Sequence, residues 1–152
     1  MIVYRAAKNI FSNKLTGEGA RVAGGRWNSK GISIIYTAES RLLCMLELAV
    51  HVGMINIPDN YKLITIEIND KVKIKKIDVA SLPKNWAKNP PPAETQIIGD
   101  KFVKENNALI LKVPSAINKE SFNYLINSAH PEFNKLQIIK KEVLKVDERL
   151  IN

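Results

Sequence analysis

The alternation of apolar and polar residues along the 152-residue chain predicts mostly short strands with a few helices. Residues 136–146 predict two short strands, divided near Lys140. No internal repeat or low-complexity tail interrupts the pattern. Further strands rich in Ile and Val are predicted at residues 2–5, 33–37, 63–68, 72–78 and 108–113. We therefore expect an α+β fold with short mixed and antiparallel strands, in a single domain spanning residues 1–152.

Two segments predict helices. Ser40 is a suitable N-cap for a helix over residues 41–53, which Gly53 would end. A second helix is expected over residues 94–106. The prolines at positions 90–92 predict a loop between regular elements rather than a boundary between domains.

Composition limits the cellular setting. A single cysteine, Cys44, excludes an internal disulfide framework and is compatible with a reducing cytoplasm. No apolar run approaches the roughly 20 residues of a membrane span. The first residues, 1–5, are typical of a strand rather than of a signal peptide. We expect a cytoplasmic protein without membrane association.

The formal net charge of +8 does not by itself identify a partner. Basic residues are spread along the chain and mixed with acids. The densest cluster alternates with apolar residues, as in a strand with one solvated face, and consists of Lys71, Lys73, Lys75 and Lys76. A nucleic-acid surface requires basic residues gathered on one face, so we expect no direct nucleic-acid binding. An anionic small molecule or an acidic protein partner fits the charge equally well.

The segment Gly24-Gly25-Arg26-Trp27-Asn28 predicts a binding loop. Paired glycines allow backbone conformations and close approaches that other residues forbid. Arg26 offers a fork of donors that suits phosphate or carboxylate, and Trp27 offers a flat face and one donor.

Glu47 is the one acid in the apolar run from Leu42 to Met54. A helix that is apolar nearly all round is expected to be buried, and a buried carboxylate needs a partner. Glu47 therefore either pairs internally with an arginine or enters a pocket. His51 lies four residues further on and shares its helix face. With two histidines and one cysteine in the chain, we expect no metal site.

Three other residues leave their roles open. Tyr36 follows the apolar pair Ile34 and Ile35 and suits either a cleft wall or the core, with its hydroxyl satisfied. Ser115 follows a strand end stopped by proline and suits a turn cap or a ligand donor. Asn123 begins a polar and aromatic stretch, residues 123–127, that suits a loop.

Together these residues resemble the successive motifs of the RES domain family. The family takes its name from an Arg, a Glu and a Ser, matched here by Arg26, Glu47 and Ser115. The resemblance runs nearly from end to end. Its segments are Tyr4-Arg5, residues 16–21, 24–28 and 36–40, Leu46-Glu47, residues 113–115 and 123–127, Trp86, Gly99-Asp100 and residues 147–150.

The resemblance implies a toxin of a bacterial toxin–antitoxin pair of the RES–Xre type, with a fold similar to that of ADP-ribosyltransferases. Family members break the bond between nicotinamide and ribose in NAD, with water or inorganic phosphate as acceptor, and some relatives modify a protein. NAD would thus be a substrate, and no cofactor is expected. The implied partner is an antitoxin with a DNA-binding helix-turn-helix domain, which covers the active site.

On that resemblance, each candidate residue takes a role. Glu47 would favour the cationic ribose that develops as nicotinamide leaves. Arg26 and Arg5 would hold the pyrophosphate, Tyr36 would stack on nicotinamide, and Ser115 would donate a hydrogen bond to the ligand. The remaining NAD-binding candidates are Trp27, Asn28 and Asn123. The rival hypothesis is a non-catalytic module that binds a nucleotide or nucleic acid, which would gain nothing from a buried acid at Glu47.

Overall fold

The computed structural model describes residues 1–151, which form one mixed seven-stranded sheet and three α-helices. The helices are α1 (Glu18–Ala23), α2 (Arg41–Val52) and α3 (Ala93–Glu105). The strands are β1 (Ile2–Lys8), β2 (Ile35–Ala38), β3 (Tyr61–Ile68), β4 (Ile74–Lys76), β5 (Ile110–Pro114), β6 (Phe122–Ile126) and β7 (Leu136–Val143). The 3-10 turns are η1 (Asn9–Phe11), η2 (Met54–Asn56), η3 (Val79–Ser81), η4 (Phe133–Lys135) and η5 (Glu148–Leu150). The predicted α+β fold is confirmed.

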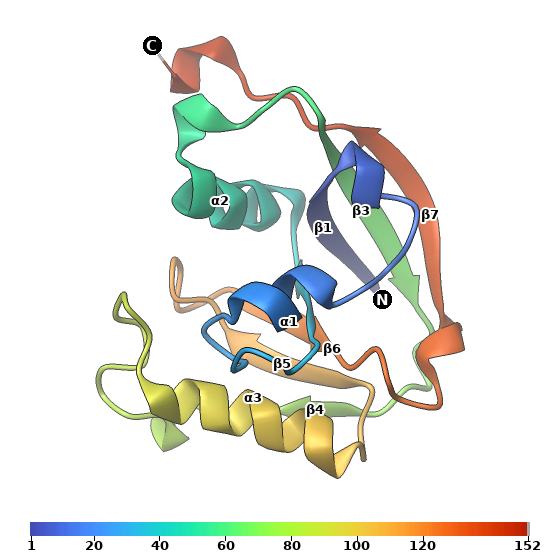
Figure 1. Cartoon of the computed structure of the whole chain (residues 1–152), viewed down its shortest axis with the longest axis vertical. Helices are drawn as coiled ribbons and strands as arrows, with labels where there is room; N and C mark the ends of the chain where they lie inside the picture. The colour runs from blue at the N-terminus through green and yellow to red at the C-terminus, as the bar shows by residue number, and fades with distance from the viewer. Residues whose placement is uncertain (152) are drawn as a thin grey trace.

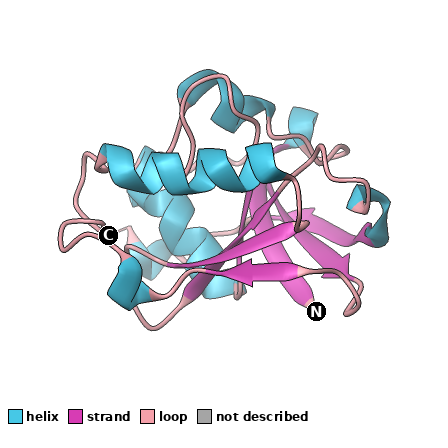
Figure 2. Ribbon diagram, turned by 90° about the horizontal axis from the view of Figure 1, so that it is seen from below, coloured by secondary structure: helices cyan, strands magenta, loops and turns pink. Residues whose placement is uncertain are grey.

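The sheet has the order β4-β5-β6-β2-β1-β3-β7, and only the β4–β5 pair is parallel among these strands. A single register pair, Tyr4 with Ala38, joins β1 to β2. The sheet therefore consists of two halves, β4-β5-β6-β2 and β1-β3-β7, which meet at that narrow junction. Figure 1 shows the strands of the two halves running in clearly different directions, and Figure 2 shows the same divergence from below.

Helices α2 and α3 begin and end as their sequences dictate. The Ser40 hydroxyl accepts the Leu43 amide at 3.1 Å, which confirms the predicted N-cap. Gly53 follows α2 with a φ of 80°, a conformation that glycine adopts without strain. Helix α3 ends at Asn106, whose φ of 49° is left-handed. Both helices lie within about two residues of their predicted bounds.

Three apolar clusters hold the layers together. One lies on the sheet face that includes Val3, Ile64 and Ile110. A second joins Phe102 of α3 to Leu111 of β5 and contains the tilted ring pair Trp27 and Trp86, 6.3 Å apart. A third packs α2 on the sheet through the following residues: Leu43, Cys44, Ala38, Leu63 and Leu144.

Several sequence predictions are wrong. Residues 122–126 form strand β6 rather than a loop, because their backbone pairs with β2 on one side and β5 on the other. Residues 136–143 form one continuous strand, because the irregularity near Lys140 is only an extra residue, Ile139, opposite Thr65 and Ile66, and pairing with β3 continues on both sides of it. Strand β4 covers only Ile74–Lys76, and α1 was not anticipated.

Helix α2 is also less buried than its apolar sequence predicts. Only Leu43 and Cys44 are buried, whereas Leu42 is 67% and Val50 is 70% exposed. His51 is exposed as well. The helix lies on the edge of the molecule and covers the sheet with one face (Figure 1).

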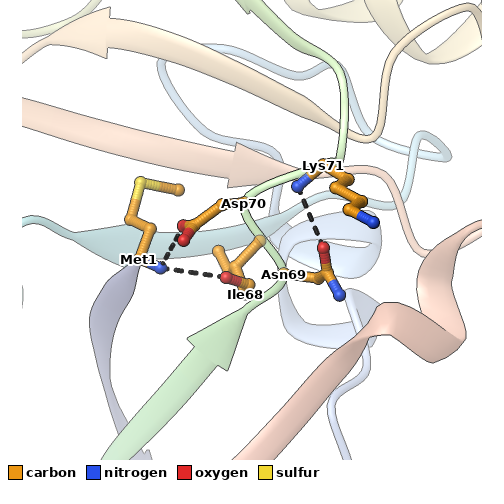
Figure 3. Close-up of polar contacts among 5 residues, drawn as sticks. All are labelled: Met1, Ile68, Asn69, Asp70 and Lys71. Carbon is orange, nitrogen blue, oxygen red and sulfur yellow. Dashed lines mark hydrogen bonds and ion pairs between the residues drawn. The ribbon is translucent and has the colours of Figure 1, made fainter.

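The turn after β3 is closed by polar contacts (Figure 3). The ammonium group of Met1 donates to the Ile68 carbonyl at 3.0 Å and to Asp70 Oδ1 at 2.8 Å, and Asn69 Oδ1 accepts the Lys71 amide. The ammonium group lowers the pKa of Asp70 below its usual value, mainly through the hydrogen bond. Within residues 1–151, no helix has the length and apolar character needed to cross a membrane.

Candidate functional site

Two residues from distant parts of the chain, Ser115 and Asn123, form hydrogen bonds with Glu47. We call these three residues the Glu47 corner. Oε1 of Glu47 accepts the Ser115 hydroxyl at 3.0 Å and the Asn123 amide, Nδ2, at 2.7 Å. Ser115 is fully buried and Asn123 is 9% exposed, whereas Glu47 is half-buried. Two buried donors therefore fix the position of Oε1. Oε2 accepts no hydrogen bond from residues 1–151.

The Ser115 hydroxyl has no capacity left for a ligand. Its proton goes to Glu47, and its oxygen accepts the amides of Ile117 at 3.1 Å and Asn118 at 3.4 Å. Donation from Ser115 to the ligand stays a prediction. The residue caps the turn after β5 and fixes the carboxylate of Glu47.

Asn123 has one polar atom to spare. Its amide group must face Glu47, because its oxygen would repel the carboxylate. Oδ1 is then buried and meets no donor in residues 1–151. A buried acceptor without a partner costs roughly 1–3 kcal/mol. A catalytic or binding role is one explanation for such a group.

Arg26 lies between the Glu47 corner and the loop after η3. Its Nη1 atom donates to the carbonyls of Trp86 at 2.6 Å and Lys88 at 2.9 Å. Partial burial lowers the pKa of the Arg26 guanidinium, and the nearby charge of Glu47 opposes that shift. No ion pair joins Arg26 to an acid within the part of the chain that is described. Arg26 thus holds the loop at 86–88 and places its positive charge close to Glu47.

Residues 24–29, which we call the glycine loop, are held by internal hydrogen bonds. The Tyr36 hydroxyl donates to Asn28 Oδ1 at 2.7 Å and accepts the Trp27 amide at 3.0 Å. The amide group of fully buried Asn28 donates to three backbone carbonyls, those of Ala20, Ser29 and Ile32. Trp27 is 2% exposed. The side chains of Trp27 and Asn28 both belong to the core, and NAD binding by these residues stays a prediction.

Tyr36 is itself mostly buried. Burial raises the pKa of its phenol well above the usual range, and the Trp27 amide opposes the shift only in part. Because the Tyr36 hydroxyl donates its hydrogen bond to Asn28, it stabilises the glycine loop. Only the aromatic ring of Tyr36 is then free to contact a ligand.

Helix α3 supports the glycine loop from the other side. Gln96 Nε2 donates to the carbonyls of Gly25 and Asn28, and Asp100 accepts the Ser29 amide at 2.9 Å and its hydroxyl at 2.6 Å. A Cβ at Gly99 would lie 1.6 Å from the Trp27 carbonyl oxygen, so only glycine fits there. A Cβ at Gly25 would likewise meet the Tyr36 hydroxyl at 2.7 Å.

Arg5 stands on β1, next to the junction of the two half-sheets. Its guanidinium is largely buried, and burial lowers its pKa. The Nη1 atom meets no acceptor in residues 1–151. Cys44 of α2 lies close enough to interact electrostatically with both Arg5 and Glu47, and burial raises its own pKa to about 12. Arg5 is thus a largely buried cation with no counter-ion among residues 1–151, close to the face of α2 that carries Cys44 and Glu47.

The structure brings most of the predicted site residues into one region, where they make different contacts. Glu47, Ser115 and Asn123 touch, and Arg26 and Tyr36 lie near enough to Glu47 to feel its charge. Gln96 and Asp100 were not assigned a role from the sequence, because nothing in a helix pattern shows that polar residues face a distant loop. Among residues 1–151, no group of His, Cys, Asp and Glu side chains is arranged to hold a metal ion.

Comparison with known proteins shows which family the chain belongs to. The model of the RES domain matches residues 2–147. The chain belongs to the RES domain family. Among RES relatives, a Sphingobium protein named Prs ADP-ribosylating toxin is 35% identical over 95% of this chain and 91% of its own. A Yersinia enterocolitica protein named Toxin Res is 37% identical over 88% of each chain.

The fold is shared with a solved structure. The crystal structure of the Mycobacterium tuberculosis MbcT–MbcA toxin–antitoxin complex matches with a TM-score of 0.78 at 23% identity, over 95% of this chain and 84% of that chain. The match confirms the expected family fold.

Proposed function

We propose that this RES domain protein is the toxin of a bacterial toxin–antitoxin pair. Relatives that cover most of the chain bear the name toxin, and the structural match comes from a toxin–antitoxin complex. The partner we propose is an antitoxin with a helix-turn-helix domain that covers the Glu47 corner. A toxin that consumes NAD would act in the cytoplasm.

The reaction we propose is cleavage of the bond between nicotinamide and ribose in NAD. The bonding electrons leave with nicotinamide and neutralise its ring, so the ribose carbon becomes cationic. Water or phosphate then bonds to that carbon and loses a proton. The observation that supports this reaction is the half-buried carboxylate of Glu47, with one oxygen anchored and the other unoccupied by protein groups.

The proposed roles follow from charge and access. The unbonded oxygen of Glu47 stabilises the cationic ribose and orients its hydroxyls. Arg26 and Arg5 supply positive charge for the pyrophosphate, and Arg5 has a buried nitrogen without an acceptor. The ring of Tyr36 contacts nicotinamide, while Ser115 and Asn123 position Glu47.

The direct test is incubation of purified protein with NAD, with and without inorganic phosphate, in the presence of chelator. Nicotinamide is expected to appear in step with NAD loss. The second product separates the acceptors, because water gives ADP-ribose and phosphate gives its 1″-phosphate ester. Intact NAD after prolonged incubation with folded, antitoxin-free protein contradicts the proposal.

A second candidate is transfer of ADP-ribose to a protein, and the name of the Sphingobium relative favours it. Incubation of the protein with labelled NAD and a bacterial lysate distinguishes the two. Label that becomes attached to one protein, and not in a Glu47→Gln variant, supports transfer. Rapid NAD loss without protein labelling supports hydrolysis or phosphorolysis.

A further inference from the structure

A basic and apolar surface lies on the opposite side of β6 from the Glu47 corner. Asn123 points toward Glu47, whereas its neighbour Phe122 packs on the other face of the strand. We define the Phe122 patch by these residues: Phe122, Lys76, Lys112, Ile77 and Val79. The last two line a hollow of about 490 Å³ together with Phe122, Lys76 and Asp78.

Two lysine ammonium groups share one aromatic ring in this patch. Lys112 Nζ lies 4.0 Å and Lys76 Nζ 5.7 Å from the centroid of Phe122. Neither ammonium forms an ion pair within residues 1–151, unlike neighbouring Lys75, which bonds to Glu105 at 3.0 Å. Two like charges without counter-ions leave the patch complementary to an anion.

The edge of the sheet lies beside the same patch. Strand β4 ends the strand order, so its outer backbone groups have no strand partner in the described sheet, and Figure 1 shows β4 at the lower side of the molecule, behind α3. Lys76 pairs in register with Lys112, which places both on one face. An added strand would therefore direct every second side chain onto the Phe122 patch.

From this geometry we propose that the β4 edge and the Phe122 patch bind an extended acidic segment of a partner protein. Its backbone would pair with β4, and alternate carboxylates would reach Lys76 and Lys112. An apolar side chain would enter the hollow, where Val79 is 41% exposed. A nucleic acid fits less well, because it has no peptide backbone to pair with a strand edge.

The test measures binding of a fluorescent peptide of alternating Glu and Val, about six residues long, by anisotropy. We expect the Lys76→Glu/Lys112→Glu double variant to bind at least about tenfold more weakly. The matched control is Lys8→Glu/Lys145→Glu, which makes the same charge change at exposed positions and leaves binding nearly intact. Thermal melting establishes that both variants are folded.

Two further probes distinguish a strand-forming acidic peptide from other anionic ligands. A peptide of the same charge with proline at alternate positions lacks strand-pairing amides and is expected to bind more weakly. A single-stranded DNA of equal charge is expected to bind weakly and without dependence on Lys76 and Lys112. The proposal is overturned if the peptide does not bind, if both double variants weaken it equally, or if the DNA binds more tightly through the same lysines.

Discussion

The Glu47 corner and the glycine loop lie side by side, and they differ in how their polar groups are used. In the glycine loop, Asn28 and the Tyr36 hydroxyl direct their hydrogen bonds to other protein groups. In the Glu47 corner, one carboxylate oxygen of Glu47 remains unbonded in the described chain. A conspicuous sequence motif can thus serve the architecture of the fold, while the carboxylate oxygen that the proposed reaction needs lies in the corner beside it.

The largest expected effect is that of Glu47→Gln, which tests the Glu47 side of this contrast. The amide keeps the shape but removes the negative charge, so NAD turnover is expected to fall by roughly 10²–10³-fold. Stability is expected to change little. The matched control is Glu94→Gln, an exposed acid on α3, which leaves turnover unchanged. Equal turnover in the two variants would remove Glu47 from the proposed mechanism.

Gly99→Ala tests the architectural side of the contrast. The new Cβ meets the Trp27 carbonyl, so α3 and the glycine loop must separate, at a cost of about 3 kcal/mol in the free energy of unfolding. Gly19→Ala is the control, because α1 has open space there and alanine favours helix by roughly 0.5–1 kcal/mol. Urea unfolding measures both. A fully stable Gly99→Ala protein would show that the close approach is not required.

Asn123→Asp examines how the corner holds its carboxylate. Two carboxylates in contact cannot both ionise easily, so the pKa of the pair rises and the acidic limit of turnover moves upward by about one pH unit. Asn123→Ala removes the donor without adding charge and is expected to lower turnover with a smaller shift. The profile of kcat against pH decides between them, and identical profiles in the two variants would exclude contact between residues 47 and 123.

Tyr36→Phe has the smallest expected effect, about 1 kcal/mol of stability near neutral pH, from the lost hydrogen bonds of the hydroxyl. Burial raises the folded pKa of Tyr36 above its usual value of 10.0, so the neutral phenol stabilises the fold below pH 10.0. That contribution is lost as pH rises further. Unfolding experiments above pH 10.0 should show a steeper loss in the wild type than in Tyr36→Phe, and parallel curves would contradict the burial.

The sequence predicts well those features that depend on neighbouring residues. Ser40 and Gly53 set the ends of α2 through local hydrogen bonds and a local φ angle. The sequence does not predict features that depend on residues far away in the chain. The pattern of residues 123–127 predicts a loop, because their pairing with β2 and β5 cannot be seen in their own sequence. The sequence of the glycine loop likewise does not show that Trp27 packs against Trp86 and α3.

The candidate site follows the same rule. Glu47 stands out in sequence because an acid in an apolar run needs a partner. Which partner it finds depends on Ser115 and Asn123, 68 and 76 positions away. The apolar face of α2 that remains exposed was not predictable, since the pattern shows the hydrophobicity of Leu42 and Val50 but not the extent of the sheet beneath them.

The long sequence separation within the Glu47 corner has a consequence for synthesis of the protein in the cell. The ribosome synthesises four of the candidate site residues early: Arg5, Arg26, Tyr36 and Glu47. The two side chains that donate hydrogen bonds to the Glu47 carboxylate, Ser115 and Asn123, are synthesised much later. A chain whose translation stops before residue 115 carries the acid without its supports and lacks strands β6 and β7 altogether. The proposed activity would thus arise late in translation, and prematurely terminated copies are expected to be harmless to the cell that makes them.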